Sequence, residues 1–215
     1  MVIGADAAGM SAASQALRTA KTTGRDLDVV VVERGSWTSY SACGIPYWIG
    51  GDVDDPQQLV ARTPAQHRAN GIDLRMGTEA TQVDLGARAV LTRDNATGVT
   101  QRLPFDQLVL ATGATPIRPD LPGAWADGIH GLQTLDDGAS LLDSLLAGRE
   151  LRRAVVVGAG YIGIEVAEAL HRRGLEVCVV DMAMQPMTTL DPDMGSLVRS
   201  EMDRMGFVVR TETPV

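Results

Sequence analysis

The chain has 215 residues, of which 45% are hydrophobic, and a formal net charge of −8. This length and composition suit one or two globular domains, and the negative charge argues against nucleic acid or an anionic membrane as the main partner. No segment has the form of a signal peptide or is apolar over enough residues to span a bilayer, and two cysteines are too few for a disulfide framework, so we expect a cytoplasmic protein.

The first 33 residues have the pattern of a strand, a turn, a helix and a second strand. In such a unit Gly4 allows the tight bend and Gly9 lets the helix pack closely on the strand, while a pyrophosphate binds at the helix N-terminus. Asp6 stands where a dinucleotide fingerprint has its middle glycine, which weakens the pattern. Glu33, at the end of the second strand, can accept hydrogen bonds from adenosine ribose hydroxyls. We therefore interpret this unit as a dinucleotide-binding one.

The first helix, expected over residues 7–20, carries a polar stripe. Ser11, Gln15 and Arg18 follow one another at intervals of four and three, so they share one face of the helix. Such a stripe beside a dinucleotide turn is either plain solvent-exposed surface or part of a binding site.

Cys43 precedes Gly44, and Pro46 stands just beyond. Because proline is favoured at an early helical position, we expect Cys43 at or just before a helix N-terminus. Free amide groups and the positive end of a helix dipole stabilise a thiolate there, which would make the sulfur a nucleophile or an electron relay. The alternative is a buried structural cysteine, which is the role we assign to Cys178 in an expected buried strand over residues 175–180.

The middle of the chain predicts a short capped helix, an antiparallel meander and a return to the first sheet. Thr63 to Gln66 has the form of a capping box with proline at the first helical position. Three extended runs are typical of a meander, near residues 77–84, 87–93 and 98–103. The pattern over residues 107–111 is typical of a buried strand, and Gly113 beyond it permits the backbone to approach a ligand closely.

A proline- and glycine-rich stretch after residue 115 is interpreted as the connection to a second unit, which repeats the first in cleaner form. Gly158, Gly160 and Gly163 form an intact G-x-G-x-x-G between an expected strand and an expected helix. The next strand ends in Asp181, which should accept a hydrogen bond from a ribose 2′-hydroxyl and would repel a 2′-phosphate. We therefore expect NADH to bind here in preference to NADPH.

Two dinucleotide sites with a reactive cysteine between them indicate electron transfer from a nicotinamide through a flavin to sulfur. We predict an α/β fold with two Rossmann-like dinucleotide-binding units, the first with an inserted antiparallel meander and the second incomplete. The expected organisation is an FAD-binding domain over residues 1–115, a linker and connecting helix over 116–150, and an NAD(P)H-binding domain over 151–215.

Taken together, these residues resemble the FAD-dependent pyridine nucleotide-disulfide oxidoreductases. Within that family they are similar to the single-cysteine branch of coenzyme A disulfide reductases and NADH oxidases or peroxidases. The resemblance spans nearly the whole chain and is carried by Gly4 to Ser14, Glu33, residues 39–51, Arg62 to Pro64, Ala111 to Gly113 and Gly158 to Glu165.

The resemblance implies cofactor contacts at the positions that match the family's motifs. For FAD these are Gly4, Asp6, Gly9, Glu33, Arg34, Ala111, Thr112 and Gly113. For NADH they are Gly158, Gly160, Tyr161, Ile162, Gly163, Glu165 and Asp181, and no metal is implied. Hydride would pass from the nicotinamide to the flavin, and electrons from the flavin to Cys43, the catalytic residue.

The resemblance also implies a substrate site. In the coenzyme A branch, polar residues on the first helix and a serine four positions before the cysteine line the coenzyme channel, and the matching positions here are Ser11, Gln15, Arg18 and Ser39. Cys43 would cycle between a thiolate and a mixed disulfide with coenzyme A. The chain departs from the branch at Ala42, where the reductases often carry Asn. Ala7 stands where peroxidases carry His, which disfavours peroxide chemistry.

We therefore expect a reductase of coenzyme A disulfide or a similar small disulfide. One alternative is an NADH oxidase that reduces oxygen at the flavin. Another is a non-catalytic nucleotide-binding fragment from a truncated reading frame, because family members are much longer and form homodimers through a further domain. On that comparison we expect the chain to stop inside the NADH unit.

Overall fold

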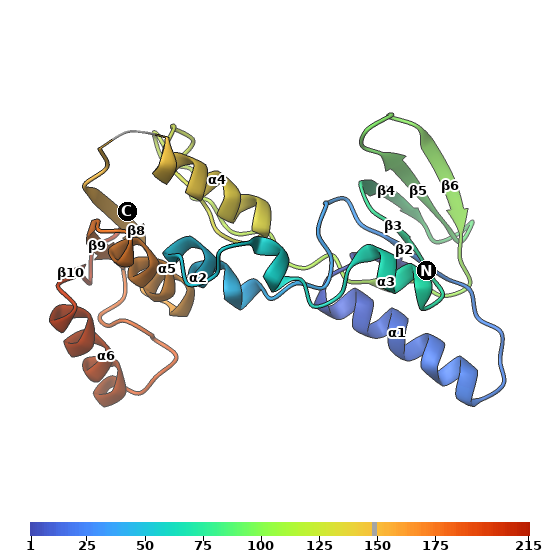
Figure 1. Cartoon of the computed structure of the whole chain (residues 1–215), viewed down its shortest axis with the longest axis horizontal. Helices are drawn as coiled ribbons and strands as arrows, with labels where there is room; N and C mark the ends of the chain where they lie inside the picture. The colour runs from blue at the N-terminus through green and yellow to red at the C-terminus, as the bar shows by residue number, and fades with distance from the viewer. Residues whose placement is uncertain (148–149) are drawn as a thin grey trace. The chain divides into compact units, whose positions relative to one another are not determined.

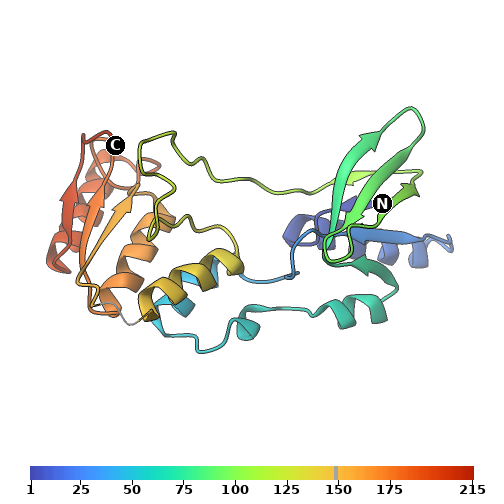
Figure 2. The ribbon, with the colours of Figure 1, turned by 90° about the horizontal axis from the view of Figure 1, so that it is seen from above.

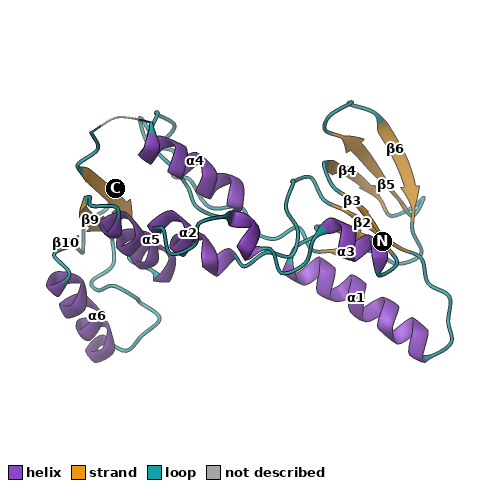
Figure 3. Ribbon diagram, viewed as in Figure 1, coloured by secondary structure: helices purple, strands orange, loops and turns teal. Residues whose placement is uncertain are grey.

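The structure is a computed structural model that describes residues 1–147 and 150–215 (Figures 1 and 3). Its contacts define two compact units, Met1–Ser41 with Leu59–Thr115 and Ala42–Gln58 with Pro116–Val215. Residues 42–58 thus group with the second unit and not with the rest of the expected segment 1–115. Residues 148 and 149 of the expected connection 116–150 lie outside the described residues.

The first unit is built on a parallel sheet with the strand order β3-β2-β1-β7. Its elements are β1 (Val2–Ile3), α1 (Ala7–Thr22), β2 (Val29–Val32), α3 (Pro64–Ala69), β3 (Ile72–Arg75) and β7 (Val109–Leu110). A 3-10 turn at Pro56–Leu59 precedes α3. Val2 pairs with Val31, and both are buried against Met10 and Ala13 of α1. β-branched residues of β1 and β2 therefore form a buried face of the sheet, and α1 covers that face.

The expected meander forms a second, antiparallel sheet in this unit. It consists of β4 (Thr78–Asp84), β5 (Ala89–Asp94) and β6 (Thr100–Pro104), in that order. Val90 of this sheet is buried together with Ile3 and Val32. Because successive residues of a strand point to opposite faces, Ile3 and Val32 belong to the face that α1 does not cover. The antiparallel sheet packs there, and the prediction of an inserted meander is confirmed.

The prediction of a buried strand over residues 107–111 is right about the strand but wrong about its burial. A strand does form at β7, parallel to β1, but Val109 is 39% exposed and Leu110 is 67% exposed. In the described sheet β7 is the edge strand, with a neighbour on one side only. An apolar run predicts a strand, and its position in the sheet decides how far the strand is covered.

The second unit has a three-stranded parallel sheet in the order β10-β9-β8. Its elements are α2 (Ile45–Gly50), α4 (Leu135–Leu146), β8 (Arg153–Val157), α5 (Tyr161–Arg172), β9 (Glu176–Val180), α6 (Pro192–Arg204) and β10 (Val208–Arg210). Val156, Val179 and Val209 are paired across the three strands and buried against α5 and α6. The predicted α/β fold with two Rossmann-like units is confirmed.

The other face of this sheet is open among the described residues. Val155 pairs with Cys178, which pairs with Val208, and the two valines are 65% and 54% exposed. Cys178 itself is half-buried. The expectation that Cys178 lies in a buried strand is therefore wrong for the face that carries Cys178, because helices cover only the face that carries the alternate residues.

The cysteine segment packs inside the second unit. Cys43 lies in a 3-10 turn, Ala42–Gly44, that leads directly into α2, and α2 packs against α4 and α5 (Figure 2). A Cβ atom at Gly138 of α4 would lie 2.9 Å from side-chain atoms of Ile45 and Trp48. Because α4 carries no side chain at this point, α2 can approach it closely and is held in place.

Candidate functional site

The first glycine turn joins β1 to α1. Gly4 has φ +101°, a conformation that L side chains rarely adopt, and its amide donates to Val32 O at 2.9 Å. A Cβ atom at Gly9 would lie 1.8 Å from Gly4 O, so only glycine fits there. At the point where a ligand would come closest to the N-terminus of α1, the turn therefore carries no side chain. This is the arrangement that binds the phosphates of dinucleotides.

Glu33 closes this turn from the end of β2. Its Oε2 accepts a hydrogen bond from the Ala5 amide at 2.8 Å, and its Oε1 accepts one from the Gly35 amide at 2.7 Å. Each carboxylate oxygen retains acceptor capacity for a further donor such as a ribose hydroxyl. Arg34 is exposed beside it, and its carbonyl accepts from Asn95 Nδ2 at 2.9 Å.

Asp6, the residue at the middle glycine position, is the N-cap of α1 but makes no side-chain cap hydrogen bond to the helix. Burial raises the pKa of its carboxyl, while hydrogen bonds from the backbones of Tyr40 and Ala7 oppose that rise and Glu33 adds to it. Its Oδ1 is buried without a hydrogen-bond partner. The acidic side chain is thus tied to the backbone of Tyr40.

The end of β7 lies against the first turn. Ala111 donates its amide to Ile3 O at 2.8 Å, and a Cβ atom at Gly4 would lie 2.1 Å from Ala111 O. Thr112 and Gly113, which follow, are exposed, and Gly113 has φ +69°. The structure therefore brings Ala111 to the glycine turn, as the expected cofactor site requires.

The second glycine turn has the same geometry. Gly158 has φ +104° and donates its amide to Val180 O at 2.8 Å, and a Cβ atom at Gly163 would lie 1.9 Å from Gly158 O. Gly160 is the N-cap of α5 and has open space around it. Tyr161 and Ile162 begin α5 with exposed side chains.

Asp181 closes the second turn as Glu33 closes the first. Its Oδ2 accepts from the Ala159 amide at 2.6 Å, and its Oδ1 accepts from the Ala183 amide at 2.7 Å. In both units the acidic residue binds the amide next to the first glycine and the amide two residues beyond itself. The chain therefore carries two copies of one ligand-binding geometry.

Cys43 is exposed in its 3-10 turn, so its sulfur can meet a reactant. Further along the same segment, Pro46 and Tyr47 line a small open pocket together with Glu165 of α5. The remaining lining residues are Asp52, Glu168, Ala169 and Arg172. Glu165, an expected NADH contact, thus shares a pocket with the helix that follows the cysteine.

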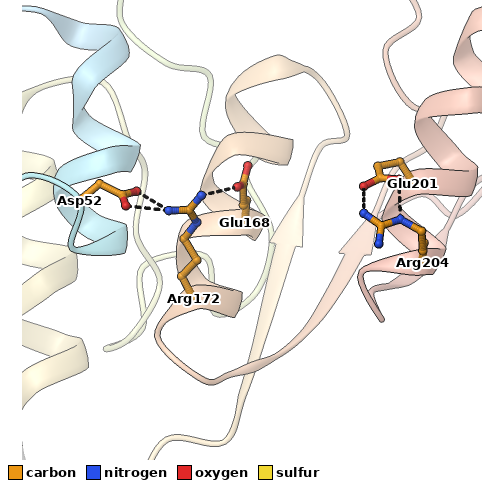
Figure 4. A network of polar contacts seen from close by, with 5 residues as sticks. All are labelled: Asp52, Glu168, Arg172, Glu201 and Arg204. Carbon is orange, nitrogen blue, oxygen red and sulfur yellow. Dashed lines mark hydrogen bonds and ion pairs between the residues drawn. The ribbon is translucent and has the colours of Figure 1, made fainter.

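An ionic network joins the two sides of this pocket (Figure 4). Arg172 Nη1 contacts Asp52 Oδ2 at 2.6 Å, and Arg172 Nη2 contacts Glu168 Oε1 at 3.0 Å. Arg173 Nε donates to Ile49 O at 2.6 Å. The sequence indicates the Glu168 pair through its i,i+4 spacing, but no sequence signal indicates that Asp52 meets Arg172.

The expected substrate residues fall into two groups. Ser11, Gln15 and Arg18 are exposed along α1, where Gln15 Nε2 donates to Thr19 Oγ1 at 3.1 Å. Ser39 instead forms a hydrogen bond to His67 of α3, with 2.8 Å between Oγ and Nε2. No hydrogen bond within residues 1–147 joins Ser39 to the α1 stripe. His67 was not among the residues expected from the sequence, although a histidine in a short capped helix was the available signal.

Residues 1–147 and 150–215 contain no group of three or more His, Cys, Asp or Glu side chains that could hold a metal ion. No helix in these two segments is long and apolar enough to cross a membrane.

The chain is similar to known proteins over its whole length. The family model described as pyridine nucleotide-disulphide oxidoreductase matches residues 1–215. The NADH oxidase of Methanocaldococcus jannaschii is 34% identical over 100% of this chain and 47% of the relative. The coenzyme A disulfide reductase of Staphylococcus epidermidis is 29% identical over 98% of this chain and 46% of the relative.

A solved structure, that of reduced Bacillus anthracis CoADR-RHD, superposes with a TM-score of 0.93 at 30% sequence identity. The superposition covers 98% of this chain and 37% of that one. The chain spans about half the length of the curated relatives it matches.

Proposed function

This chain belongs to the pyridine nucleotide-disulphide oxidoreductase family, and on that premise we propose that it is part of a flavoprotein that reduces a small disulfide with electrons from NADH. FAD would bind the first unit, NADH the second, and Cys43 would be the redox cysteine. The observation that carries the proposal is the repeated turn, with Glu33 and Asp181 each closing a glycine turn of the same geometry. Such turns bind dinucleotides, and this chain has two.

The residues of the first unit fit an adenine dinucleotide. A side chain at Gly9 would fill the space against Gly4 O, and the amides at the start of α1 are available to a pyrophosphate. Glu33 would accept the ribose hydroxyls, while Ala111 and Thr112 border the turn beyond the end of β7. When bound, FAD would supply the two-electron chemistry between a nicotinamide and a sulfur.

The second unit fits NADH better than NADPH. The Asp181 carboxylate stands at the end of β9, where a ribose 2′-hydroxyl can donate to it and a 2′-phosphate would be repelled. Gly158, Gly160 and Gly163 leave the start of α5 unobstructed, and Tyr161 and Glu165 lie on the same helix. The name of the Methanocaldococcus jannaschii relative, NADH oxidase, supports the same cofactor.

Cys43 would carry the disulfide chemistry. Its exposed thiolate attacks one sulfur of the substrate, which forms a mixed disulfide and releases the other half as a thiolate. Two electrons delivered to this mixed disulfide return Cys43 to a thiolate and release the second half. One NADH, one proton and one disulfide are thereby converted to NAD⁺ and two thiols.

Coenzyme A disulfide is the substrate that the chain's residues support best. Arg18 offers a cation for a phosphate group, and Ser11, Gln15 and Ser39 offer neutral hydrogen-bonding groups. The similarity to a coenzyme A disulfide reductase supports this assignment. An NADH oxidase that reduces oxygen is the second candidate, and the 34% identity to a relative of that name favours it.

The test is an absorption spectrum of the purified 215-residue chain before and after anaerobic addition of NADH. A bound flavin that bleaches would support the proposal, and a colourless protein that consumes no NADH would favour a non-catalytic nucleotide-binding fragment. Coenzyme A disulfide reduction and oxygen uptake are then measured separately. Cys43→Ser should abolish disulfide reduction, whereas Cys178→Ser, the matched control, should leave its rate unchanged. Disulfide reduction that survives in Cys43→Ser would refute the role of this cysteine.

A further inference from the structure

Ser39 is held rigidly within the first unit. Its φ of +49° is unusual for a residue with a side chain, and its carbonyl accepts from the Ala61 amide at 2.8 Å. On one side, Thr38 Oγ1 donates to Ala5 O of the glycine turn at 2.5 Å. On the other, Tyr40 pairs with Val60 and its backbone bonds to Asp6. A serine in a strained conformation with so many restraints is a candidate for ligand binding.

His67 is the side-chain partner of Ser39. It lies in α3, which begins with the reciprocal capping box of Thr63 and Gln66, and it is 1% exposed. His67 Nε2 lies 2.8 Å from Ser39 Oγ, while Nδ1 is buried with no hydrogen-bond partner. Burial lowers the pKa of His67, and the nearby Arg62 guanidinium lowers it further, so the imidazole is neutral at physiological pH.

The two neutral tautomers make opposite demands on Ser39. With the proton on Nδ1, Ser39 would donate to Nε2, and a buried N–H would be left without an acceptor. With the proton on Nε2, the imidazole donates to Ser39 Oγ, and the unpartnered atom is an acceptor. In proteins a buried N–H without an acceptor is rarer than a buried acceptor without a donor. The Nε2–H tautomer is therefore favoured. Ser39 is only half-buried, so its own O–H can then reach solvent or a ligand.

We propose that His67 is a positioning residue that donates to Ser39 Oγ and thereby leaves the Ser39 O–H to donate to an acceptor oxygen of the substrate. That oxygen belongs to a phosphate or an amide carbonyl, both of which coenzyme A disulfide carries. The inference rests on the proposed function in one respect, the identity of the ligand. The hydrogen bond between His67 and Ser39 stands on the geometry of the unit alone.

The first experiment determines the tautomer in the full chain by long-range ¹H–¹⁵N correlation. The chain has three histidines, His67, His130 and His171, and the signals lost in His67→Phe assign the first of them. We expect His67 to carry its proton on Nε2 between pH 6 and pH 8, and Ser39→Ala to shift its Nε2 resonance while those of the other two stay in place. The proposal is overturned if the His67 proton is on Nδ1, or if the His67 Nε2 resonance stays in place in Ser39→Ala.

The second experiment measures the dissociation constant of coenzyme A disulfide. His67→Phe keeps a buried planar ring without a donor, and His67→Gln replaces Nε2–H by an amide donor of similar reach. We expect His67→Phe and Ser39→Ala each to weaken binding by about two- to tenfold, as the loss of one hydrogen bond does, and His67→Gln to retain most of the affinity. If His67→Phe and His67→Gln weaken the binding of coenzyme A disulfide equally, the positioning role of His67 is overturned.

The two experiments separate failure of this inference from failure of the proposed function. A folded wild-type chain that does not bind coenzyme A disulfide contradicts that choice of substrate and the ligand role of Ser39. The tautomer measurement then still decides whether His67 donates to Ser39, because it needs no ligand.

Discussion

Asp181 Oδ2 accepts a hydrogen bond of 2.6 Å from the backbone amide of Ala159. Glu33 makes the equivalent contact to Ala5 at 2.8 Å in the other unit. In each case a carboxylate at the end of the unit's second strand fixes the glycine turn by accepting from a backbone amide of that turn. On the proposed function the same group would also select the ribose, so its removal should be costly in two ways.

Asp181→Ala should weaken NADH binding by about tenfold or more, because a hydrogen bond to a charged group is lost and the Ala159 and Ala183 amides lose their acceptor. NADPH binding should weaken less, since the repulsion of its 2′-phosphate disappears. Fluorescence titration of both nucleotides measures this. Glu33→Ala is the matched control and should leave NADH affinity unchanged. An unaltered preference for NADH in Asp181→Ala would show that another group selects the ribose.

Gly163→Ala should destabilise the second unit by about 1–3 kcal/mol, because its Cβ atom would lie 1.9 Å from Gly158 O and the backbone would have to shift. Gly160→Ala, three residues earlier, meets open space and should cost less than about 1 kcal/mol. Urea unfolding followed by tryptophan fluorescence, to which buried Trp48 of the second unit contributes, compares the two variants. Similar midpoints for both would contradict the close packing of α5 on the first glycine.

Local chemistry is what the sequence predicts well in this chain. The turns at Gly4 and Gly158 follow from glycine spacing, and the capping box at Thr63 follows from four consecutive residues. The meander was predicted because turn residues separate its extended runs. Burial was predicted less well, because whether β7 or Cys178 is covered depends on which other elements pack on that face of the sheet.

In the candidate site, too, features encoded by nearby residues were predicted, whereas contacts between residues far apart in the chain were not. Each acidic residue at a strand end was predicted as a ribose ligand, since its distance along the chain from the glycine turn is characteristic. Ser39 was predicted from a resemblance, but its partner His67 was not, because 28 positions separate them. Likewise, the contact between Asp52 and Arg172 joins residues 120 positions apart. Contacts of this kind follow from packing, and no periodicity in the sequence encodes them.

Arg172→Ala should lower the free energy of unfolding only slightly, because exposed ion pairs contribute little, but by more than Arg204→Ala, because it loses two carboxylate partners at once. One of these, Asp52, follows α2, so the pair holds two segments of the second unit together (Figure 4). Arg204→Ala is the control, because Arg204 pairs with Glu201 inside a single helix and loses one carboxylate partner only, so its effect on stability should be smaller. An Arg172→Ala variant no less stable than Arg204→Ala would show that the Asp52 contact contributes nothing.

His67→Phe should change how stability depends on pH. Burial, and next the charge of Arg62, lower the pKa of His67 in the folded protein below its ordinary value of about 6.5. Between these two pKa values the unfolded chain binds more protons than the folded one, so wild-type stability is fully present above about pH 6.5 and declines as the pH falls. His67→Phe has no such proton to bind, so its unfolding midpoint in urea should fall less than that of the wild type between about pH 7 and pH 5. Because every carboxylate is shared by the two proteins, the difference between their pH profiles isolates His67. Parallel profiles would mean that the His67 imidazole titrates alike in both states and is not buried in its neutral form.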